Sequence, residues 1–327
     1  MNIDNMKLDL IDKKLLSYVY HHFREPYTKI AKKCNISRDQ VEYRIKKYNS
    51  SGLVKGYLTM FNYKSLGYNQ LGFIFLKLKS PEMKEEVMLE IRKVSTIITI
   101  GSIMPSYDLF TTIVSKNNED FNEVFYDLID RIKTKINSQE YFIITSTHLY
   151  PLKIFGVKEK STYSLISESK EVSLSNKEVS ILKALEKGSN SKIIDLARES
   201  KISSELAIYI IKKLKSSNIL LGSRIQFNMS KLGYSFTVIR INVDNLNKET
   251  QSRMIYFAKE HKNIDSITFG ISEFNCIIQI LHQNQEELTK TIRDIYSQFG
   301  KNIKKSDLLL VGEDEVIRTL PPIMKIK

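Results

Sequence analysis

The sequence repeats itself, and this repeat constrains the fold more than any other feature. The segment that begins at Leu8 aligns, without a gap, on the segment that begins at Leu174. Farther along, Phe61-Asn62 falls on Phe227-Asn228, and Leu66-Gly67-Tyr68 falls on Leu232-Gly233-Tyr234. Because these later matches lie outside any expected helix, shared helical periodicity does not explain them. The chain is therefore predicted to be a tandem duplication of one unit.

Each unit is predicted to hold a helical head followed by a sandwich of βαββαβ order. In the first unit, the apolar patterns and turn residues predict strand, helix, strand, strand, helix and strand at 71–78, 81–93, 97–103, 107–114, 119–135 and 141–147. The same order is predicted in the second unit at 236–243, 248–261, 264–271, 274–281, 285–299 and 307–311. The expected fold class is α+β, with winged helix-turn-helix heads and ferredoxin-like sandwiches duplicated in tandem.

Shifts in composition divide the chain into domains. We predict a winged helix-turn-helix domain at 1–62, a βαββαβ domain at 63–156, a polar, serine-containing linker at 157–172, a second, degenerate winged-helix domain at 173–230 and a second βαββαβ domain at 231–327. The residues from Asn62 to Tyr68 are rich in turn formers and are predicted to form a hinge.

The first head is predicted to contain three helices and a wing. Helical periodicity places the helices at 8–16, 28–34 and 37–48, with Asn35-Ile36 as the tight turn between the last two. Gly52 is predicted to end the third helix. The residues 53–60 then have the alternation of a β-wing.

The helix that follows Ser37 has the features of a DNA recognition helix. Val41, Ile45 and Tyr48 form one apolar stripe, which leaves a polar and net basic face for a partner. Ser37 is placed to cap the helix N-terminus, where partial positive charge favours a phosphate. The net charge of +13 suits a polyanion, and most basic residues of the first head lie between Lys29 and Lys55. A solvated amphipathic helix is the plainer alternative.

The second head departs from this pattern. At the positions equivalent to Arg38, Gln40, Glu42 and Arg44 it has Ser204, Leu206, Ile208 and Ile210. An outer face of this kind more often marks an interface than a DNA reader. We therefore predict that the second head no longer reads bases and packs against another part of the protein or another chain.

The sequence argues against several other classes of protein. It has no apolar run long enough to cross a membrane and no export signal at Met1–Leu10, so a soluble, cytoplasmic protein is expected. Cys34 and Cys276 lie in apolar runs and are predicted to be core thiols, not metal ligands or a disulfide. No catalytic triad, phosphate loop or metal-ligand spacing emerges. We expect no enzymatic activity, no cofactor and no metal.

Several motifs of the first head together resemble a known family. These are Leu8-Asp9-x-Ile11-Asp12, Ile30-Ala31, Ile36-Ser37 with Val41 and Arg44-Ile45, and Gly52-Leu53-Val54-x-Gly56-Tyr57. They are similar to the head of the Lrp/AsnC family of leucine-responsive, "feast/famine" regulators, and the βαββαβ unit resembles that family's effector and oligomerisation (RAM) domain. The resemblance implies a sequence-specific transcription regulator that binds double-stranded DNA and forms a homodimer or higher oligomer through its sandwiches.

The resemblance also implies which residues contact DNA. Carried over to this sequence, the set is Ser37, Arg38, Gln40, Arg44 and Lys47, with Tyr43 facing the groove. By side-chain type, Arg38 suits a guanine edge and Gln40 an adenine, whereas Arg44, Lys46 and Lys47 suit phosphates. On this basis, Arg44→Ala would weaken binding to every DNA sequence.

An amino-acid-like effector is a further implication of the resemblance. In this family a glycine and a nearby acidic residue, at the junction of the second and third strands, help to hold an amino acid between subunits. The candidates here are Gly101 with Asp108, and Gly270. The first loop is predicted to be two residues longer than the second, which lacks an equivalent of Asp108. Plain turns between neighbouring strands would explain both loops equally well.

Two other functions stay open from the sequence. Siroheme decarboxylases share the plan of head and sandwich, but this chain has no Trp and no His beside the expected pocket strand at 107–111. An adaptor that binds other proteins would show weak DNA affinity and little preference for one site. The sequence also leaves open whether the two sandwiches pair within one chain or between chains.

Overall fold

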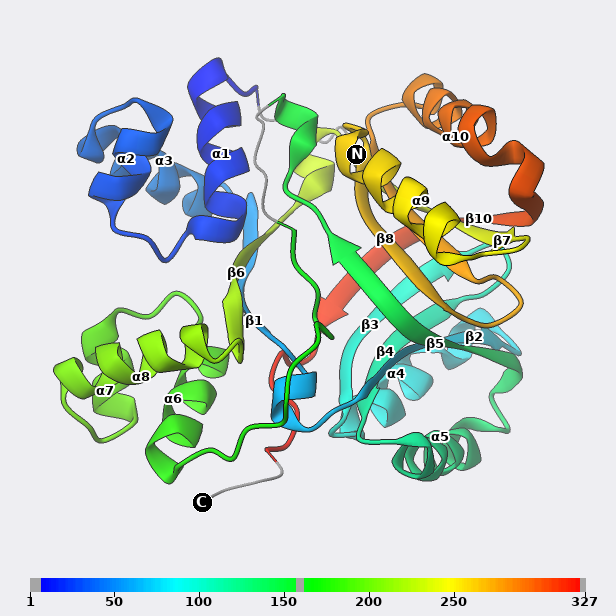
Figure 1. Cartoon of the computed structure of the whole chain (residues 1–327), viewed down its shortest axis with the longest axis horizontal. Helices are drawn as coiled ribbons and strands as arrows, with labels where there is room; N and C mark the ends of the chain where they lie inside the picture. Colours follow the sequence, from blue (N-terminus) through cyan, green and yellow to red (C-terminus); the bar gives the residue numbers. More distant parts are fainter. Residues whose placement is uncertain (1–6, 157–161, 324–327) are drawn as a thin grey trace.

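The structure is a computed structural model that describes residues 7–156 and 162–323, with the two heads on one side and the two sandwiches on the other (Figure 1). The first head contains α1 (Leu10–His22), α2 (Tyr27–Cys34) and α3 (Arg38–Ser50). The side chains of Asp9 and Ser37 cap α1 and α3, and Asn35 adopts a left-handed conformation in the turn before α3. The predicted helix-turn-helix is confirmed.

The first sandwich has the predicted βαββαβ order. Its elements are β2 (Gln70–Leu78), α4 (Lys84–Lys93), β3 (Ile97–Met104), β4 (Leu109–Ser115), α5 (Asn118–Ile132) and β5 (Ile136–Leu149). Pro81 begins a short 3₁₀ turn ahead of α4, and not α4 itself. β5 is longer than predicted because its first part pairs with β2 and its last part pairs with a strand of the second unit.

The second unit repeats the first. Its head contains α6 (Asn176–Lys187), α7 (Ile193–Glu199) and α8 (Ser204–Ser216), followed by the strand β6 (Leu220–Phe227). Its sandwich contains β7 (Ser235–Val243), α9 (Lys248–Glu260), β8 (Ile264–Ile271), β9 (Cys276–His282), α10 (Gln285–Phe299) and β10 (Ile303–Val316). Among the described residues, no helix has both the length and the apolar character needed to span a membrane.

The two sandwiches pair with each other within the chain. Their strands form one closed barrel in the order β10, β3, β4, β2, β5, β8, β9 and β7. Two seams join the units, because β5 pairs with β8 and β10 pairs with β3. The helices α4 and α5 cover the first sandwich, and α9 and α10 cover the second (Figure 1). The question that the sequence left open is thus answered in favour of pairing inside one chain.

The predicted wing forms a sheet between the two heads instead. The strand β1 (Val54–Phe61) pairs antiparallel with β6, and the equivalent residues Leu58 and Arg224 lie opposite each other. Two reciprocal backbone bonds flank the sheet, from Asn62 N–H to the Ile219 carbonyl (2.9 Å) and from Asn228 N–H to the Leu53 carbonyl (2.7 Å). A pseudo-twofold axis therefore passes between Leu58 and Arg224. The predicted wing strand is therefore present, and it pairs with the corresponding strand of the other unit.

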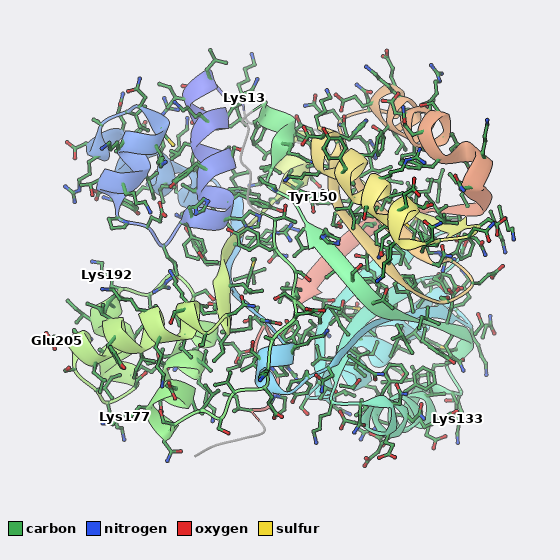
Figure 2. All side chains as sticks on the ribbon, in the orientation of Figure 1. Lys13, Lys133, Tyr150, Lys177, Lys192 and Glu205 are labelled. Carbon is green, nitrogen blue, oxygen red and sulfur yellow. The ribbon has the colours of Figure 1, made fainter. Side chains whose placement is uncertain are left out.

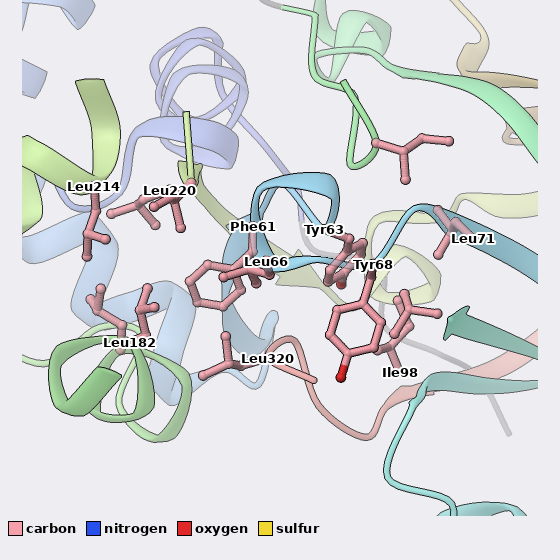
Figure 3. Close-up of a cluster of buried hydrophobic side chains, with 14 of the residues drawn as sticks. Phe61, Tyr63, Leu66, Tyr68, Leu71, Ile98, Leu182, Leu214, Leu220 and Leu320 are labelled. Carbon is pink, nitrogen blue, oxygen red and sulfur yellow. The ribbon is translucent and has the colours of Figure 1, made fainter. Parts of the chain in front are cut away.

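Each head packs on the sandwich of the other unit. The core of the first head continues into Met229, Leu232 and Leu281. The core of the second head continues into Phe61, Tyr68 and Leu71, and Figure 3 shows this cluster running from Leu182 and Leu214 to Ile98. The units are thus exchanged across β1 and β6.

Because of this exchange, the residues that were expected to form a hinge are packed between domains. Tyr63, Leu66 and Tyr68 are buried between the second head and the first sandwich. The amide of Asn62 is also buried and donates to the Ser167 carbonyl (3.2 Å). The turn-forming residues at this point of the sequence make a packed corner, so the prediction of a hinge was wrong.

Candidate nucleic-acid interface and barrel interior

The N-terminus of α3 is capped by its own side chains. Ser37 Oγ accepts from the backbone N–H of Gln40 (3.1 Å), and Gln40 Oε1 accepts from the backbone N–H of Ser37 (2.9 Å). This capping box fixes the first turn of the helix. Bidentate pairing with adenine uses both the oxygen and the NH₂ group of a glutamine, so Gln40 would have to break one capping bond to read that base.

A polar face of α3 is exposed, whereas Val41 and Tyr48 are buried as predicted. The side chain of Arg38 is 60% exposed and that of Lys46 is 76% exposed. Both lie near Glu42, at 3.8 Å and 2.9 Å, in exposed pairs that contribute little to stability and that phosphates can replace. Six predicted DNA contacts therefore share one accessible helix: Ser37, Arg38, Gln40, Tyr43, Lys46 and Lys47.

Arg44 does not belong to this face. Its side chain is 17% exposed and turns toward the N-terminus of α1, where it pairs with Asp9 (2.8 Å) and with Asp12. The hydroxyl of the buried Tyr48 donates to the same Asp12 (2.6 Å). The hydrogen bond to Asp9 is the largest of several interactions that raise the pKa of Arg44. The expectation that Arg44 is exposed to a phosphate was wrong, because the guanidinium joins α1 to α3.

Arg44→Ala is therefore expected to lower the stability of the first head instead of its electrostatic attraction to DNA. Removal of the guanidinium leaves the buried Asp12 carboxylate without its cation, which costs about 3 kcal/mol. We expect a lower urea midpoint and, under conditions where the variant is folded, an unchanged dependence of DNA affinity on salt. A salt slope shallower by about one unit would show instead that Arg44 contacts a phosphate.

The outer face of α8 is partly apolar, as the sequence indicated. Ile208 and Tyr209 are exposed, while Ile210, the equivalent of Arg44, is buried in the second head. Lys213, the equivalent of Lys47, pairs with Glu178 (2.6 Å). Figure 2 shows Glu205 at the outer edge of this head, away from the sandwiches. None of the described residues covers Ile208 and Tyr209, so for these residues the predicted packing would require another molecule.

The candidate effector residues lie in different surroundings. Gly101 is inside β3, where a Cβ atom would meet the ring of Phe110, and Gly270 is inside β8, where a Cβ would meet the Phe142 ring and the Ile143 carbonyl. Neither glycine lies in a turn, and the two loops, 105–108 and 272–275, have equal length. The predicted difference in loop length was wrong.

Asp108 also has a structural partner. Its carboxylate accepts from the backbone N–H of Leu78 (2.8 Å) and from Lys77 Nζ (3.2 Å). It therefore faces β2, and the structure does not bring Gly101, Asp108 and Gly270 together as one site.

A buried cation lies near these two loops. Arg240 is 3% exposed in its side chain and pairs with Glu140 (3.0 Å) from the first unit and Asp307 (2.6 Å) from the second. Its guanidinium lies over the rings of Phe75, Tyr107 and Phe274, 4.4–5.1 Å from their centroids. Burial alone would raise the pKa of Glu140, but hydrogen bonds from Tyr107 and Ser272 and the charge of Arg240 hold it below its usual range. Arg240 thus joins the two sandwiches.

The interior of the barrel holds a cavity of about 290 Å³. Side chains from both sandwiches, from β1 and β6 and from α1 line it. Among the described residues that line it, Arg224 is the only charged one and none is a histidine. A wider hollow of about 670 Å³ lies outside the barrel between α9 and α10. The chemistry that distinguishes the interior cavity is one cation in an otherwise uncharged wall.

The burial of His21, near Arg224 of the interior cavity, leads us to expect that stability depends on pH. Burial, helped by the charge of Arg224, lowers the pKa of His21 from 6.5 to about 3. Below pH 6.5 the unfolded chain therefore binds a proton that the native chain does not, and stability falls as the pH decreases. His21→Leu is expected to reduce the slope of unfolding free energy against pH by about 1.4 kcal/mol per unit over this range. Urea titrations at several pH values measure the slope, and equal slopes for both proteins would contradict the expectation.

Comparison with known proteins agrees with the geometry of the first head. Residues 8–55 match the family described as winged helix-turn-helix DNA-binding. The chain is 30% identical to the HTH-type transcriptional regulator FL11 of Pyrococcus horikoshii over 141 residues, which are 43% of this chain and 91% of that protein. It is 25% identical to the regulatory protein AsnC of Haemophilus influenzae over 130 residues, 39% of this chain and 87% of that protein. The chain belongs to the Lrp/AsnC family.

The whole architecture has a parallel among solved structures. The crystal structure of the siroheme decarboxylase NirDL matches 98% of this chain and 93% of its own, with a TM-score of 0.60 and 14% sequence identity. At this identity the likeness concerns the fold alone. This Lrp/AsnC chain therefore shares its duplicated head-and-sandwich fold with an enzyme, and its sequence over the first unit with regulators.

Sequence reasoning missed the two arginines inside the barrel region. Arg240 and Arg224 each interrupt a strand of otherwise alternating or apolar residues, in Ser235–Val243 and Leu220–Phe227. A single long cation at an inward position of a strand is a signal that could have been used. Which face of each strand points inward became clear only from the pairing of the two units.

Proposed function

We propose that this protein is a transcription regulator that binds double-stranded DNA through the exposed face of α3. The observation that carries the proposal is the grouping of Arg38, Tyr43, Lys46 and Lys47 on one accessible, N-capped helix of a helix-turn-helix. Arg38 suits the edge of a guanine, and the two lysines suit phosphates on either side of the groove. The homology of the first unit to regulators supports the same function.

The proposed complex contains more than one chain. The two heads of one chain differ from each other in their outer faces, because α3 is basic and α8 is partly apolar. Two equivalent recognition helices, which a palindromic site requires, therefore come from two chains. Their half-sites would lie on one face of the DNA, at a spacing of about ten base pairs or a multiple of it.

We further propose that the protein is not a tetrapyrrole decarboxylase. Histidine is absent from the described lining of the interior cavity, and its volume of about 290 Å³ lies at the lower end of the range of small-molecule pockets. The interior cavity is therefore small for a substrate as large as a tetrapyrrole.

Selection of bound fragments from genomic DNA, followed by competition titrations, tests the proposal. A regulator is expected to prefer its selected site over bulk DNA by roughly 10³ or more at physiological salt. Equal affinity for selected and bulk DNA would favour the adaptor function instead. In parallel, titration with an iron-uroporphyrin should leave the Soret spectrum of the free ligand unchanged, and a shifted Soret band would favour the enzyme.

A further inference from the structure

The wall of the interior cavity departs from the pseudo-twofold symmetry of the molecule. It lies where the inter-head sheet meets the barrel, with Leu58 and Arg224 both in its wall. These two residues are equivalents in the duplication and face each other across the pseudo-twofold axis. One copy therefore has an apolar side chain and the other a cation at the same position. The second unit also has a buried carboxylate, Asp265, beside its cation, whereas the equivalent residue of the first unit is Ile98.

The surroundings of Arg224 keep it in the wall of the cavity. Its guanidinium donates to the hydroxyl of Tyr20, lies over the Tyr20 ring at 4.8 Å from the centroid, and is 3.6 Å from the Asp265 carboxylate. Asp265 is buried behind the wall and is not part of the lining. The charge of Arg224 is therefore oriented by its neighbours beside a space that is otherwise neutral.

The remaining wall is mostly apolar and carries two matched polar pairs. In the first unit, Thr99 and Thr112 share a hydrogen bond of 2.5 Å, and in the second unit the equivalent Ser266 donates to Gln279 (3.3 Å). Because these pairs satisfy each other, they do not require a ligand. Between them the rings of Phe73, Phe110 and Phe236 border the cavity.

We propose that the cavity binds a small, mainly apolar carboxylic acid, with its carboxylate at Arg224 and its apolar part among the phenylalanine rings. A charge-assisted bond from a guanidinium to a carboxylate is strong where water is excluded. Burial raises the pKa of Asp265. Burial thus disfavours the charged form of this carboxyl group, which lies 3.6 Å from Arg224.

The same wall disfavours amino acids. The α-ammonium of an amino acid is best paired with an anion, and no described residue of the lining carries a carboxylate. The side-chain carbonyls of the lining are those of Gln226 and Gln279, and Gln279 already accepts from Ser266. Next to Arg224, that ammonium would also meet a like charge. The site is therefore distinct in place and in chemistry from the one expected around Gly101, Asp108 and Gly270.

Calorimetric titration of the full chain with three molecules that share a phenylpropyl framework tests the inference. The probes are phenylpropanoate, its uncharged amide, and phenylalanine, which keeps the carboxylate and adds an α-ammonium group. We expect phenylpropanoate to bind at least about tenfold more tightly than the amide and than phenylalanine. Equal binding of all three, or binding of none, would overturn the proposal.

Two variants assign the site. Arg224→Leu, which copies the residue found at the equivalent position 58, is expected to remove the preference for the acid over the amide. Val238→Phe fills the cavity from β7 without touching Arg224, and it is expected to abolish binding of both probes. Unchanged binding in either folded variant would overturn the proposal. Since these titrations contain no DNA, the inference and the proposed function can fail independently.

Discussion

Arg240→Leu is expected to destabilise the protein by about 3–4 kcal/mol. The substitution removes a buried cation and leaves Glu140 and Asp307 facing each other as partly buried carboxylates, one from each unit. It also removes the contact between the guanidinium and three aromatic rings. The expected result is a large decrease in the urea midpoint of unfolding. Unfolding is monitored by circular dichroism and tyrosine fluorescence.

A neutral triple variant provides the control for Arg240. In Arg240→Leu, Glu140→Gln and Asp307→Asn together, no charge is left unpaired, so most of the lost stability should return. If the triple variant were no more stable than the single one, the loss would come from packing and not from unpaired charge. A single-variant cost below about 1 kcal/mol would show that solvent reaches the cluster.

The double variant Lys46→Ala and Lys47→Ala is expected to weaken DNA binding by about 10–100-fold. Each lysine that neutralises a phosphate releases counterions, so the slope of log affinity against log salt should become shallower by nearly two units. The substitutions lie on the exposed face of α3, away from Val41 and Tyr48, so the fold should be retained. Affinity is measured by fluorescence anisotropy at several salt concentrations.

The duplication supplies the matched control for this variant. Lys212→Ala and Lys213→Ala change the equivalent positions of α8, with the same change in net charge. If α3 alone reads DNA, this control should keep site preference and most of the salt slope. Loss of specific binding in the control would contradict the proposal that the second head no longer reads bases.

The order of elements was predictable from sequence because each depends on local patterns. The capping of α3 by Ser37, the burial of Val41 and Tyr48, and the repeated βαββαβ order follow from helix and strand periodicity. The duplication could be recognised from Leu66-Gly67-Tyr68 and its copy, because unusual residues recur at fixed spacing. Such features need no knowledge of which distant segments meet.

The failures share a physical cause. The strand that the wing pairs with, the burial of the expected hinge and the burial of Arg44 are each decided by a contact with a segment distant in sequence. β1 pairs with β6, Tyr68 is covered by the second head, and Arg44 of α3 reaches Asp12 of α1. Periodicity along the chain cannot specify which of two equivalent partners a strand or side chain selects.

The exchange of heads between the units has a consequence during synthesis. The hydrophobic core of the first head includes residues as late in the sequence as Leu281. A ribosome adds about 5–20 residues per second, so these residues are synthesised well after the head itself. The nascent polypeptide therefore carries an incompletely covered head, and an unpaired β1 edge, for on the order of ten seconds or more. A chaperone that covers exposed apolar surfaces and strand edges would bind the nascent chain during this interval. A product truncated after the first unit would have an unpaired β1 edge that could pair with β1 of a second copy.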